Sequence, residues 1–211
     1  MTIRWLGHAC FLITSKAGVR VLIDPFDASV GYKVPAVEAD VVLSTHDHSD
    51  HNAINVVKGQ PQIIKGSGRH QAKGIDFTGV SSFHDTAVGS LRGRNTIFAF
   101  ELDGVRLCHL GDLGHVLDTK QLEKLEGTDI LLIPVGGKYT INAAKAVEVI
   151  SQIEPRIIIP MHYKIPGLKA DIDGVEKFIK ELGIKQRQEE KLKIFKKDLP
   201  QEDMELVILS M

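Results

Sequence analysis

A cluster of histidines and aspartates constrains this chain more than any other feature of its sequence. Residues 45–51 read Thr-His-Asp-His-Ser-Asp-His and directly follow the largely apolar run 40–44. A short run of this kind indicates a buried strand, so the cluster lies where a strand ends. Imidazole nitrogen and carboxylate oxygen are the ligands that hold zinc and similar ions. Because so many titratable groups near a core would be costly to bury without a cation, the cluster predicts a metal site.

The spacing within the cluster favours two metals over one. His46 and His48 are two residues apart, so in extended backbone their side chains leave the same face of the chain. Asp50 and His51 then lie on the following turn, where they can point at a second position a few ångströms away. The simpler alternative is a polar loop that happens to be rich in histidine, and the compact H-x-H-x-D-H pattern argues against it.

Composition indicates one globular domain. The chain has 211 residues, of which 43% are hydrophobic and 25% charged, enough for a substantial core. Its formal net charge of −1 gives no long-range field to attract nucleic acid or an anionic membrane. Cys10 and Cys108 are too few for a disulfide framework and suit a reducing compartment. With no apolar stretch of bilayer length and no signal peptide, we expect a cytoplasmic protein.

Short apolar runs separated by turns predict a chain rich in strands, with most helices in the second half. Strands are expected at 3–6, 10–14, 19–23, 40–44, 62–65, 75–83, 96–102, 105–110, 129–134, 156–160, 191–195 and 205–209. Helices are expected at 52–58, 118–126, 140–153 and 171–182. Asp118 and Gln121 have the spacing of a capping box at the start of the second helix. The loops 26–38, 66–74 and 166–170 are expected to form pocket walls.

A weak internal repeat relates the two halves of the chain. Residues 10–20 align without gaps on residues 96–106, and each copy continues through an apolar strand to an aspartate, Asp24 or Asp112. The repeat predicts a single domain, 1–211, built from two similar β-rich halves, about 1–90 and 91–211, packed face to face. A coincidental similarity between two hairpins is the alternative.

The chain resembles the metallo-β-lactamase-fold hydrolase superfamily. The resemblance rests on residues 45–51, preceded by Asp24 and followed by His84, Asp112 and His162 in the order expected for that superfamily. Within it, Gly7-His8, residues 92–95 and Gly136-Gly137 resemble a small group of hydrolases like ascorbate-6-phosphate lactonase. The resemblance implies an α/β fold, a four-layer αβ/βα sandwich with two mixed, mostly antiparallel sheets.

The same resemblance implies a ligand set and a reaction. One metal would be held by His46, His48 and His84, the other by Asp50, His51 and His162, with Asp112 bridging them. The implied cofactors are two divalent ions, zinc first, with manganese or iron as alternatives. A metal-bridging hydroxide would attack a small ester, lactone or phosphodiester. Asp50 would carry the proton released in the reaction.

Further side chains are candidates for roles around the metals. Asp24 could orient a ligand histidine, or simply form an Asp-Pro turn. His8 and His115 could reach the mouth of the site as general acid or substrate contact, and His109 could support Asp112; a structural role is the alternative for each. The stretch with Arg92, Arg94 and Asn95 could bind an anionic group or remain a surface loop.

Other functions with the same ligands stay open. A nuclease of this fold would need a basic groove, which the net charge disfavours, and the lysine- and arginine-rich residues 177–197 are explained by a solvated face. An iron-dependent oxidoreductase and a non-catalytic metal-binding protein are the remaining alternatives. We expect a small-molecule substrate, on which an anionic group would fit, and no nucleic-acid partner. A homo-oligomer is left open.

Overall fold

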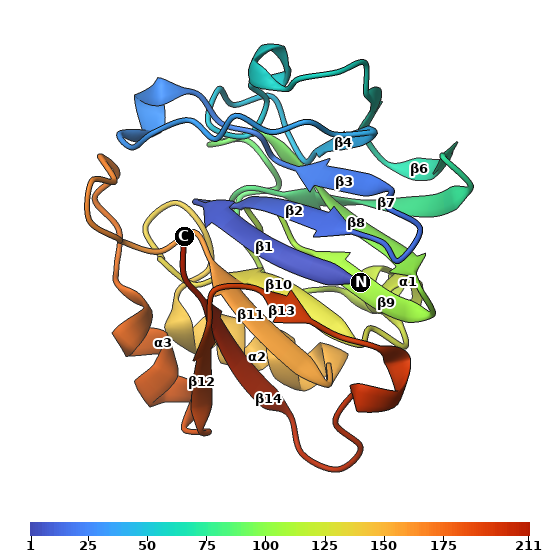
Figure 1. Cartoon of the computed structure of the whole chain (residues 1–211). Coiled ribbons are helices and arrows are strands. Elements are labelled where there is room, and N and C mark those ends of the chain that lie inside the picture. Colours follow the sequence, from blue (N-terminus) through green and yellow to red (C-terminus); the bar gives the residue numbers. More distant parts are fainter.

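Two β-sheets face each other across the core of the computed structural model, which describes residues 1–211 (Figure 1). The first sheet has six strands in the order β13-β1-β2-β3-β4-β5, and the second has eight in the order β12-β14-β11-β10-β9-β8-β7-β6. The strands are β1 Thr2–Gly7, β2 Cys10–Thr14, β3 Arg20–Ile23, β4 Val41–Ser44, β5 Gln62–Lys65, β6 Gly68–Ala72, β7 Ile75–Phe83, β8 Arg94–Leu102, β9 Val105–His109, β10 Ile130–Pro134, β11 Ile157–Met161, β12 Gln186–Glu189, β13 Leu192–Lys193 and β14 Glu205–Leu209. The expected two-sheet α/β architecture is confirmed.

The two sheets share one pairing pattern. In the first, β1, β2 and β3 are antiparallel neighbours, and β4 and β5 continue in parallel. In the second, β7, β8 and β9 are antiparallel, and β10 and β11 continue in parallel. Both sheets are therefore mixed. In the eight-stranded sheet the neighbours β9-β10-β11-β14-β12 all pair in parallel, so this sheet is not mostly antiparallel. We propose on this pattern that the domain consists of two similar halves.

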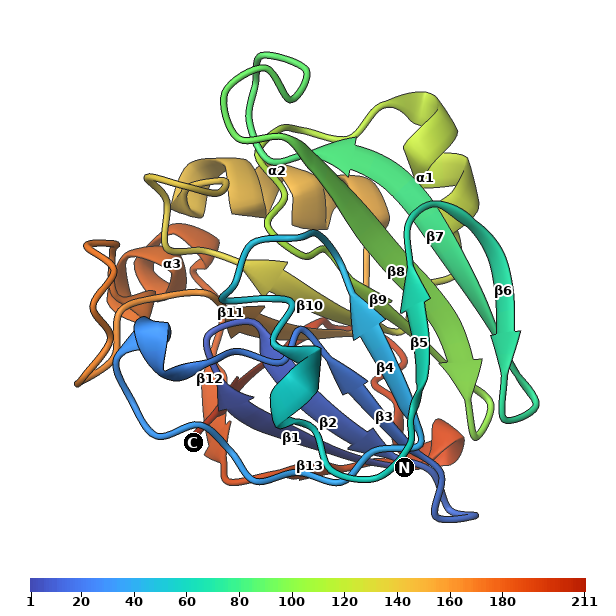
Figure 2. The same ribbon diagram turned by 90° about the horizontal axis from the view of Figure 1, so that it is seen from above.

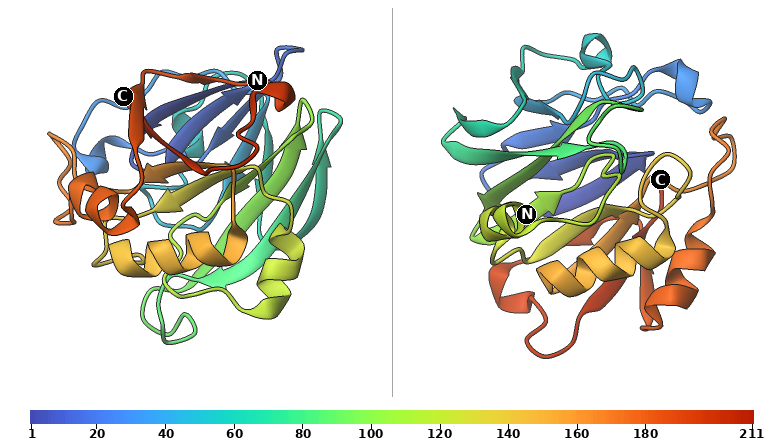
Figure 3. Two further views of the ribbon diagram at one scale, coloured as in Figure 1. Left: turned by 90° about the horizontal axis from the view of Figure 1, so that it is seen from below. Right: turned by 180° about the vertical axis from the view of Figure 1, so that it is seen from behind.

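All three α-helices lie outside the eight-stranded sheet (Figure 2; Figure 3, right). They are α1 Thr119–Leu125, α2 Ala143–Ile153 and α3 Val175–Leu182. The capping box at the start of α1 is present, because Asp118 accepts from Gln121 N at 2.8 Å while the Gln121 side chain accepts from Asp118 N at 3.0 Å. The middle of α2 is buried through Ala146, Val149 and Ile150, which join the core beneath it.

The outer layer on the six-stranded sheet is formed by loops instead of α-helices. The helix expected at 52–58 is wrong, since the structure has only the three-residue 3₁₀ turn Ile54–Val56 there. Ala53 supplies no side-chain cap for its first turn, and Val57 is already extended, so nothing stabilises a longer helix. A second 3₁₀ turn, Ala28–Val30, lies in the same layer. Phe26 and Val30 pack there against the outward face of the sheet.

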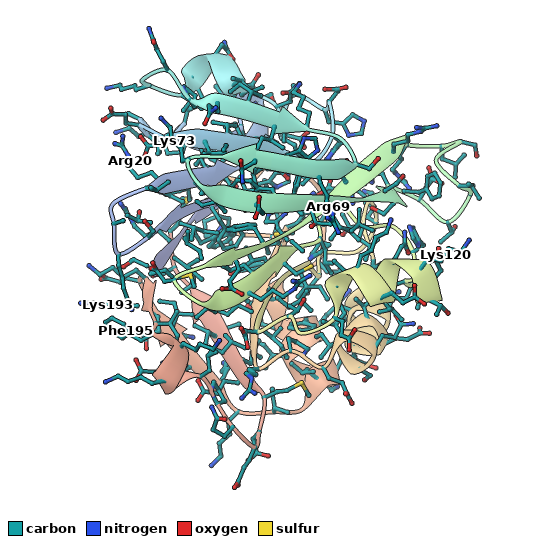
Figure 4. All side chains as sticks on the ribbon, turned by 90° about the vertical axis from the view of Figure 1, so that its right-hand side faces the viewer. Arg20, Arg69, Lys73, Lys120, Lys193 and Phe195 are labelled. Carbon is teal, nitrogen blue, oxygen red and sulfur yellow. The ribbon has the colours of Figure 1, made fainter.

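Two strands at sheet edges escaped the sequence prediction. β6 lies in the expected loop 66–74, and β12 follows the last helix. They are the two edge strands of the eight-stranded sheet, which is why both are largely polar and exposed. The strand expected at 191–195 is only two residues long, in β13. Lys193 and Phe195 lie side by side at the surface (Figure 4), with the ammonium 6.0 Å from the ring centre. No helix of the structure is long and apolar enough to cross a membrane.

The strands next to the site are completely buried in the core. Every residue of β4, β10 and β11 is buried, as expected for parallel strands covered on both faces. At one end the two sheets are also joined by backbone hydrogen bonds. His162 N donates to His8 O at 3.0 Å, and Thr96 N donates to Thr45 O at 2.9 Å. These links place the ends of strands from both sheets next to one another.

Candidate metal centre

The candidate site is built from residues that follow strands of both sheets. From the six-stranded sheet come His8 after β1, Asp24 after β3 and residues 45–51 after β4. From the eight-stranded sheet come His84 after β7, Asp112 three residues beyond β9 and His162 after β11. Loops at strand ends commonly carry function because the sheets fix their starting points.

Sharp backbone turns bring three of these side chains inward. His8, Asp24 and His162 each directly follow a strand and have positive φ values of 52°, 49° and 51°. Residues other than glycine adopt this left-handed conformation uncommonly, and when they do it often marks a functional site. At His162 the backbone also passes close to Gly136, where an added Cβ would lie 2.2 Å from His162 O. Only glycine fits at position 136 without moving that turn.

Asp112 is the centre of the cluster. The imidazole Nε2 atoms of His84, His51 and His162 lie 3.0, 3.2 and 3.3 Å from its Oδ2, and that of His46 lies 3.9 Å away. The side chain is almost completely buried. Burial disfavours its charge, but His162 and His51 outweigh burial and hold the pKa of Asp112 well below its usual value. The centre therefore presents a carboxylate surrounded by imidazoles.

The potential ligand atoms fall into three groups, of which the third, His46, His51 and Asp112, shares a histidine with each of the other two. His46, His48 and His84 form one, with ligand atoms within 4.8 Å of one another. His51 and His162 form a second group with His8, within the same limit. Asp50 lies beside this second group, since its Oδ2 is 3.2 Å from His8 Nε2 and 3.9 Å from His51 Nε2. The structure thus brings all seven proposed ligands to one place.

Buried atoms without partners at the centre fit a cation. His46 Nε2, His51 Nε2 and Asp112 Oδ1 are buried and make no hydrogen bond. Such atoms are expensive to leave unsatisfied, and nearly all buried polar atoms in proteins have partners. A divalent cation would accept lone pairs from all three. The donor set of imidazole and carboxylate also suits zinc and related ions.

Asp24 fixes the orientation of one proposed ligand. Its carboxylate accepts from Thr45 N at 2.8 Å, from Thr45 Oγ1 at 2.7 Å and from His51 Nδ1 at 2.9 Å. Burial opposes the charge on Asp24, but the hydrogen bond from His51 outweighs it and lowers the pKa of the carboxyl. With Nδ1–H donated to Asp24, Nε2 is the ring atom of His51 that faces the centre and would offer its lone pair to a cation.

His109 and Asn95 hold the segment that carries Asp112. His109 Nε2 donates to Ala9 O at 2.9 Å, and its Nδ1 accepts from Gly111 N at 3.1 Å. Asn95 Oδ1 accepts from Asp112 N at 3.0 Å, while Asn95 Nδ2 donates to Leu110 O. Both side chains act on the backbone around Asp112 and do not face the cavity, so they are placed to support it.

His8 is a buried neutral histidine that contacts Asp50. Burial, together with the neighbouring His162, lowers the pKa of His8 to about 4, although the hydrogen bond to Asp50 opposes this shift. At neutral pH the ring is uncharged and donates Nε2–H to Asp50. The pKa of Asp50, which burial would raise, is instead held far below its usual value by His8 and His51.

Two expected site residues do not reach the centre. His115 accepts from Phe83 N at 3.1 Å and donates to Val116 O at 2.8 Å, so both ring nitrogens bind backbone and neither faces the cavity. The expectation that His115 lies at the mouth is therefore not supported by the geometry. Arg94 is exposed and lines a neighbouring groove instead of the metal cavity.

A cavity of about 400 Å³ opens onto the centre. Its wall consists of His8, His48, Asp50, His84, Arg92, Asp112, Tyr139, His162 and Ala170. Tyr139 was not singled out from the sequence, because an isolated tyrosine after a strand carries no pattern. The stacking of Arg92 on its ring, at 5.6 Å, likewise depends on tertiary structure.

Two facing mixed sheets with histidines and aspartates gathered at their strand ends define a protein of the metallo-β-lactamase fold. Comparison with known proteins agrees. Residues 2–162 match the family model described as Beta-lactamase superfamily domain. A UPF0173 metal-dependent hydrolase of Archaeoglobus fulgidus is 31% identical, over 87% of this chain and 93% of its own. A Thermotoga maritima structure described as belonging to the metallo-β-lactamase superfamily is 38% identical, with a TM-score of 0.82, and the match covers 99% of this chain and 98% of that one.

The chain belongs to the beta-lactamase superfamily domain family, and it is a metal-dependent hydrolase of the metallo-β-lactamase superfamily. A more distant structure shows how far the fold extends. A diiron β-hydroxylase from Streptomyces venezuelae is 15% identical, with a TM-score of 0.56, over 76% of this chain and 44% of its own. That likeness concerns the fold alone.

Proposed function

We propose that this chain is a dinuclear hydrolase that cleaves a small ester, lactone or phosphodiester by attack of water. The observation that supports the proposal best is the convergence of imidazoles from both sheets on Asp112, with buried atoms left unpartnered around it. His46, His48 and His84 would hold one cation, and Asp50, His51 and His162 the other, with Asp112 between them. When bound, two divalent ions, zinc first and manganese or iron as alternatives, would supply Lewis acidity and a water with its pKa lowered towards about 7.

The protein's own residues would orient the ligands and move the proton. Asp24 keeps His51 in the tautomer with a free Nε2 lone pair, and His109 and Asn95 hold the backbone of Asp112. Asp50 lines the cavity and is ionised at neutral pH, so it can accept a proton from the attacking water and pass it to the departing oxygen. Its hydrogen bond from His8 fixes which oxygen is free for this transfer.

The size of the cavity favours a small substrate. A volume of about 400 Å³ lies in the range typical of small-molecule sites. Seven of the nine residues that line it carry an imidazole, carboxylate or guanidinium group, which suits a substrate with several oxygen atoms. The formal net charge of −1 gives no support to an extended nucleic-acid partner.

The proposal is tested by metal analysis followed by an activity panel. Protein purified without chelator is expected to carry close to two divalent ions per chain by elemental analysis. It should hydrolyse at least one member of a panel of aryl esters, lactones and bis(p-nitrophenyl) phosphate. Chelation should remove this activity and zinc should restore it. Full activity of metal-stripped protein would refute the proposal.

Two histidine substitutions distinguish a proposed metal ligand from a histidine outside the site. His48→Ala should abolish turnover and lower the metal content while leaving the fold intact. His70→Ala changes a histidine on β6 that bonds only Gly66 O, and it should leave both unchanged. Equal effects of the two substitutions would argue against a site at His48.

A further inference from the structure

One cationic side chain reaches the metal cavity without an acidic partner. Arg92 is the only lysine or arginine among the residues that line this cavity. Its guanidinium forms no ion pair and packs 5.6 Å from the centre of the Tyr139 ring. In the neighbouring grooves Lys65 pairs with Asp47 and Lys138 pairs with Asp171, whereas Arg94 and Lys145 form no ion pair but do not line the metal cavity. Arg92 is thus a positive charge at the site that no protein carboxylate compensates.

The loop that carries Arg92 is held by a buried carboxylate. Asp85, which is 4% exposed, follows His84 directly and accepts four backbone hydrogen bonds. The donors, at 2.7–3.0 Å, are the N–H groups of Ala87, Gly89, Leu91 and Arg92. Val88 in this loop has a φ of 57°, which is unfavourable for a β-branched residue and needs surroundings that enforce it. The carboxylate therefore fixes the point from which the Arg92 side chain starts.

Arg92 also stands between the metal cavity and two neighbouring grooves. A groove of about 490 Å³ without hydrophobic lining begins at His46 and His48, and a smaller one of about 210 Å³ lies beside Tyr139. Arg92 lines both of them as well as the metal cavity. A substrate that extends from the cavity into either groove would pass the guanidinium.

We infer that Arg92 binds an anionic group of the substrate beside the bond that is cleaved. The inference rests on the proposed function and narrows it: the substrate is an ester, lactone or phosphodiester that carries a carboxylate or phosphate in addition to the reacting group. A guanidinium presents paired N–H donors that match both anions. Arg92 is the residue that selects charged over neutral substrates, and Asp85 is a positioning residue that acts through it.

Calorimetric titration of the zinc-loaded protein with small carboxylates tests the inference without turnover. Acetate offers one carboxylate for the metals, whereas succinate and glutarate offer a second one for Arg92. The better dicarboxylate should bind roughly 10- to 100-fold more tightly than acetate, the range expected for a charged hydrogen-bonded pair. Arg92→Gln should remove this gain without changing the zinc content, and Arg92→Lys should restore part of it.

Arg94→Gln is the matched control, because Arg94 lies two residues away but outside the metal cavity. It should keep the preference for dicarboxylates. The inference would be overturned if Arg92→Gln still bound the dicarboxylate more tightly than acetate, or if Arg94→Gln lost this difference to the same extent as Arg92→Gln.

A kinetic comparison separates this inference from the proposed function. The wild-type protein should have a higher kcat/KM for mono-p-nitrophenyl glutarate than for p-nitrophenyl acetate. In Arg92→Gln, KM for the anionic ester should rise roughly 10-fold or more, with little change for the neutral ester. Equal use of both esters by wild-type and variant would overturn the role of Arg92 and leave the hydrolase intact. Absence of turnover with retained dicarboxylate binding would count against the proposed reaction and still support the anion site.

Discussion

In each sheet a buried aspartate follows the last of three antiparallel strands, β1-β2-β3 or β7-β8-β9, and the two sheets use it differently. Asp24 follows β3, and all the hydrogen bonds to its carboxylate come from protein donors, Thr45 and His51. Asp112 follows β9, and its Oδ1 has no partner while its Oδ2 faces imidazoles. One sheet thus supplies an aspartate that orients a ligand, and the other supplies an aspartate that is itself available to a cation.

The strand pairings locate the source of this difference. Asp24 N donates to Leu43 O in the neighbouring β4 at 2.9 Å, and Leu110 N donates to Leu132 O in the neighbouring β10 at 3.0 Å. The position equivalent to Asp24 is therefore Leu110, and Asp112 lies two residues further on. Gly111 makes the extension possible, because it has a φ of 57° and an added Cβ would lie 2.3 Å from Asn95 Oδ1. A two-residue extension moves the carboxylate from a supporting position to the centre.

Replacing the central aspartate should have the largest effect. Asp112→Ala leaves the surrounding imidazoles without their shared anion, so we expect turnover to be abolished and the metal content to fall. Circular dichroism should show a retained fold, because the apolar core does not depend on this side chain. Undiminished activity would show that the two aspartates do not differ as described.

Replacing the supporting aspartate should have a smaller and graded effect. Asp24→Asn keeps the shape but removes the charge that accepts from His51 Nδ1, so metal affinity or activity should fall roughly 10- to 100-fold. Competition with a chromogenic chelator measures the affinity, and assays at saturating zinc measure what activity remains. A loss as complete as that of Asp112→Ala would make Asp24 a ligand.

Histidines that follow strands of the two different sheets should also differ in their response to pH. The pKa of His8 is lowered to about 4 by burial, whereas that of His84 is raised because Asp112 outweighs its burial. A lowered folded pKa means that the unfolded chain takes up a proton first, so His8 costs the metal-free protein stability as pH falls from about 6.5 towards 4. The full shift corresponds to about 3 kcal/mol.

His8→Gln should therefore reduce the loss of unfolding free energy between pH 7 and pH 4.5, measured by urea titration of the metal-free protein. Buried His46, whose pKa is lowered to about 3, contributes to the same pH range, so part of the loss should remain. An unchanged pH dependence in the variant would mean that His8 is not neutral in the folded protein.

The smallest effect is expected far from both aspartates. Asp118→Ala removes the capping box of α1 and should lower the unfolding free energy by about 1 kcal/mol. Turnover should stay at the wild-type level, since α1 carries no residue of the metal cavity. Lost activity in this variant would indicate that the helix layer influences the site directly.

Local patterns made much of the site predictable. Residues 45–51 have a compact spacing, and His84, Asp112 and His162 each come after an apolar run. These patterns were sufficient to predict that the side chains lie together, because the strand ends of two stacked sheets meet. The helix at 118–126 was predictable because its cap is a local interaction. The gap-free repeat pairs residue 10 with residue 96, an offset that puts Leu110 and not Asp112 opposite Asp24, and the strand pairing shows the same register.

Features that depend on tertiary contacts were not predictable. The polar edge strands β6 and β12 carry no apolar alternation, so only their neighbours reveal them. Arg92, and not Arg94, lines the metal cavity. This depends on the conformation of the loop, which four backbone hydrogen bonds to Asp85 hold in place. His115 resembled a site residue because it is close in sequence to Asp112, yet backbone groups occupy both of its nitrogens.

The hydrogen bonds His162 N to His8 O and Thr96 N to Thr45 O connect opposite sheets beside the cluster. Neither sheet carries a complete set of the proposed donors, because His46, His48 and His51 follow β4 whereas His84 and His162 follow β7 and β11, so an ion can be retained only after both sheets have packed together. Retention of zinc during refolding is consequently a reporter that the two sheets have come together.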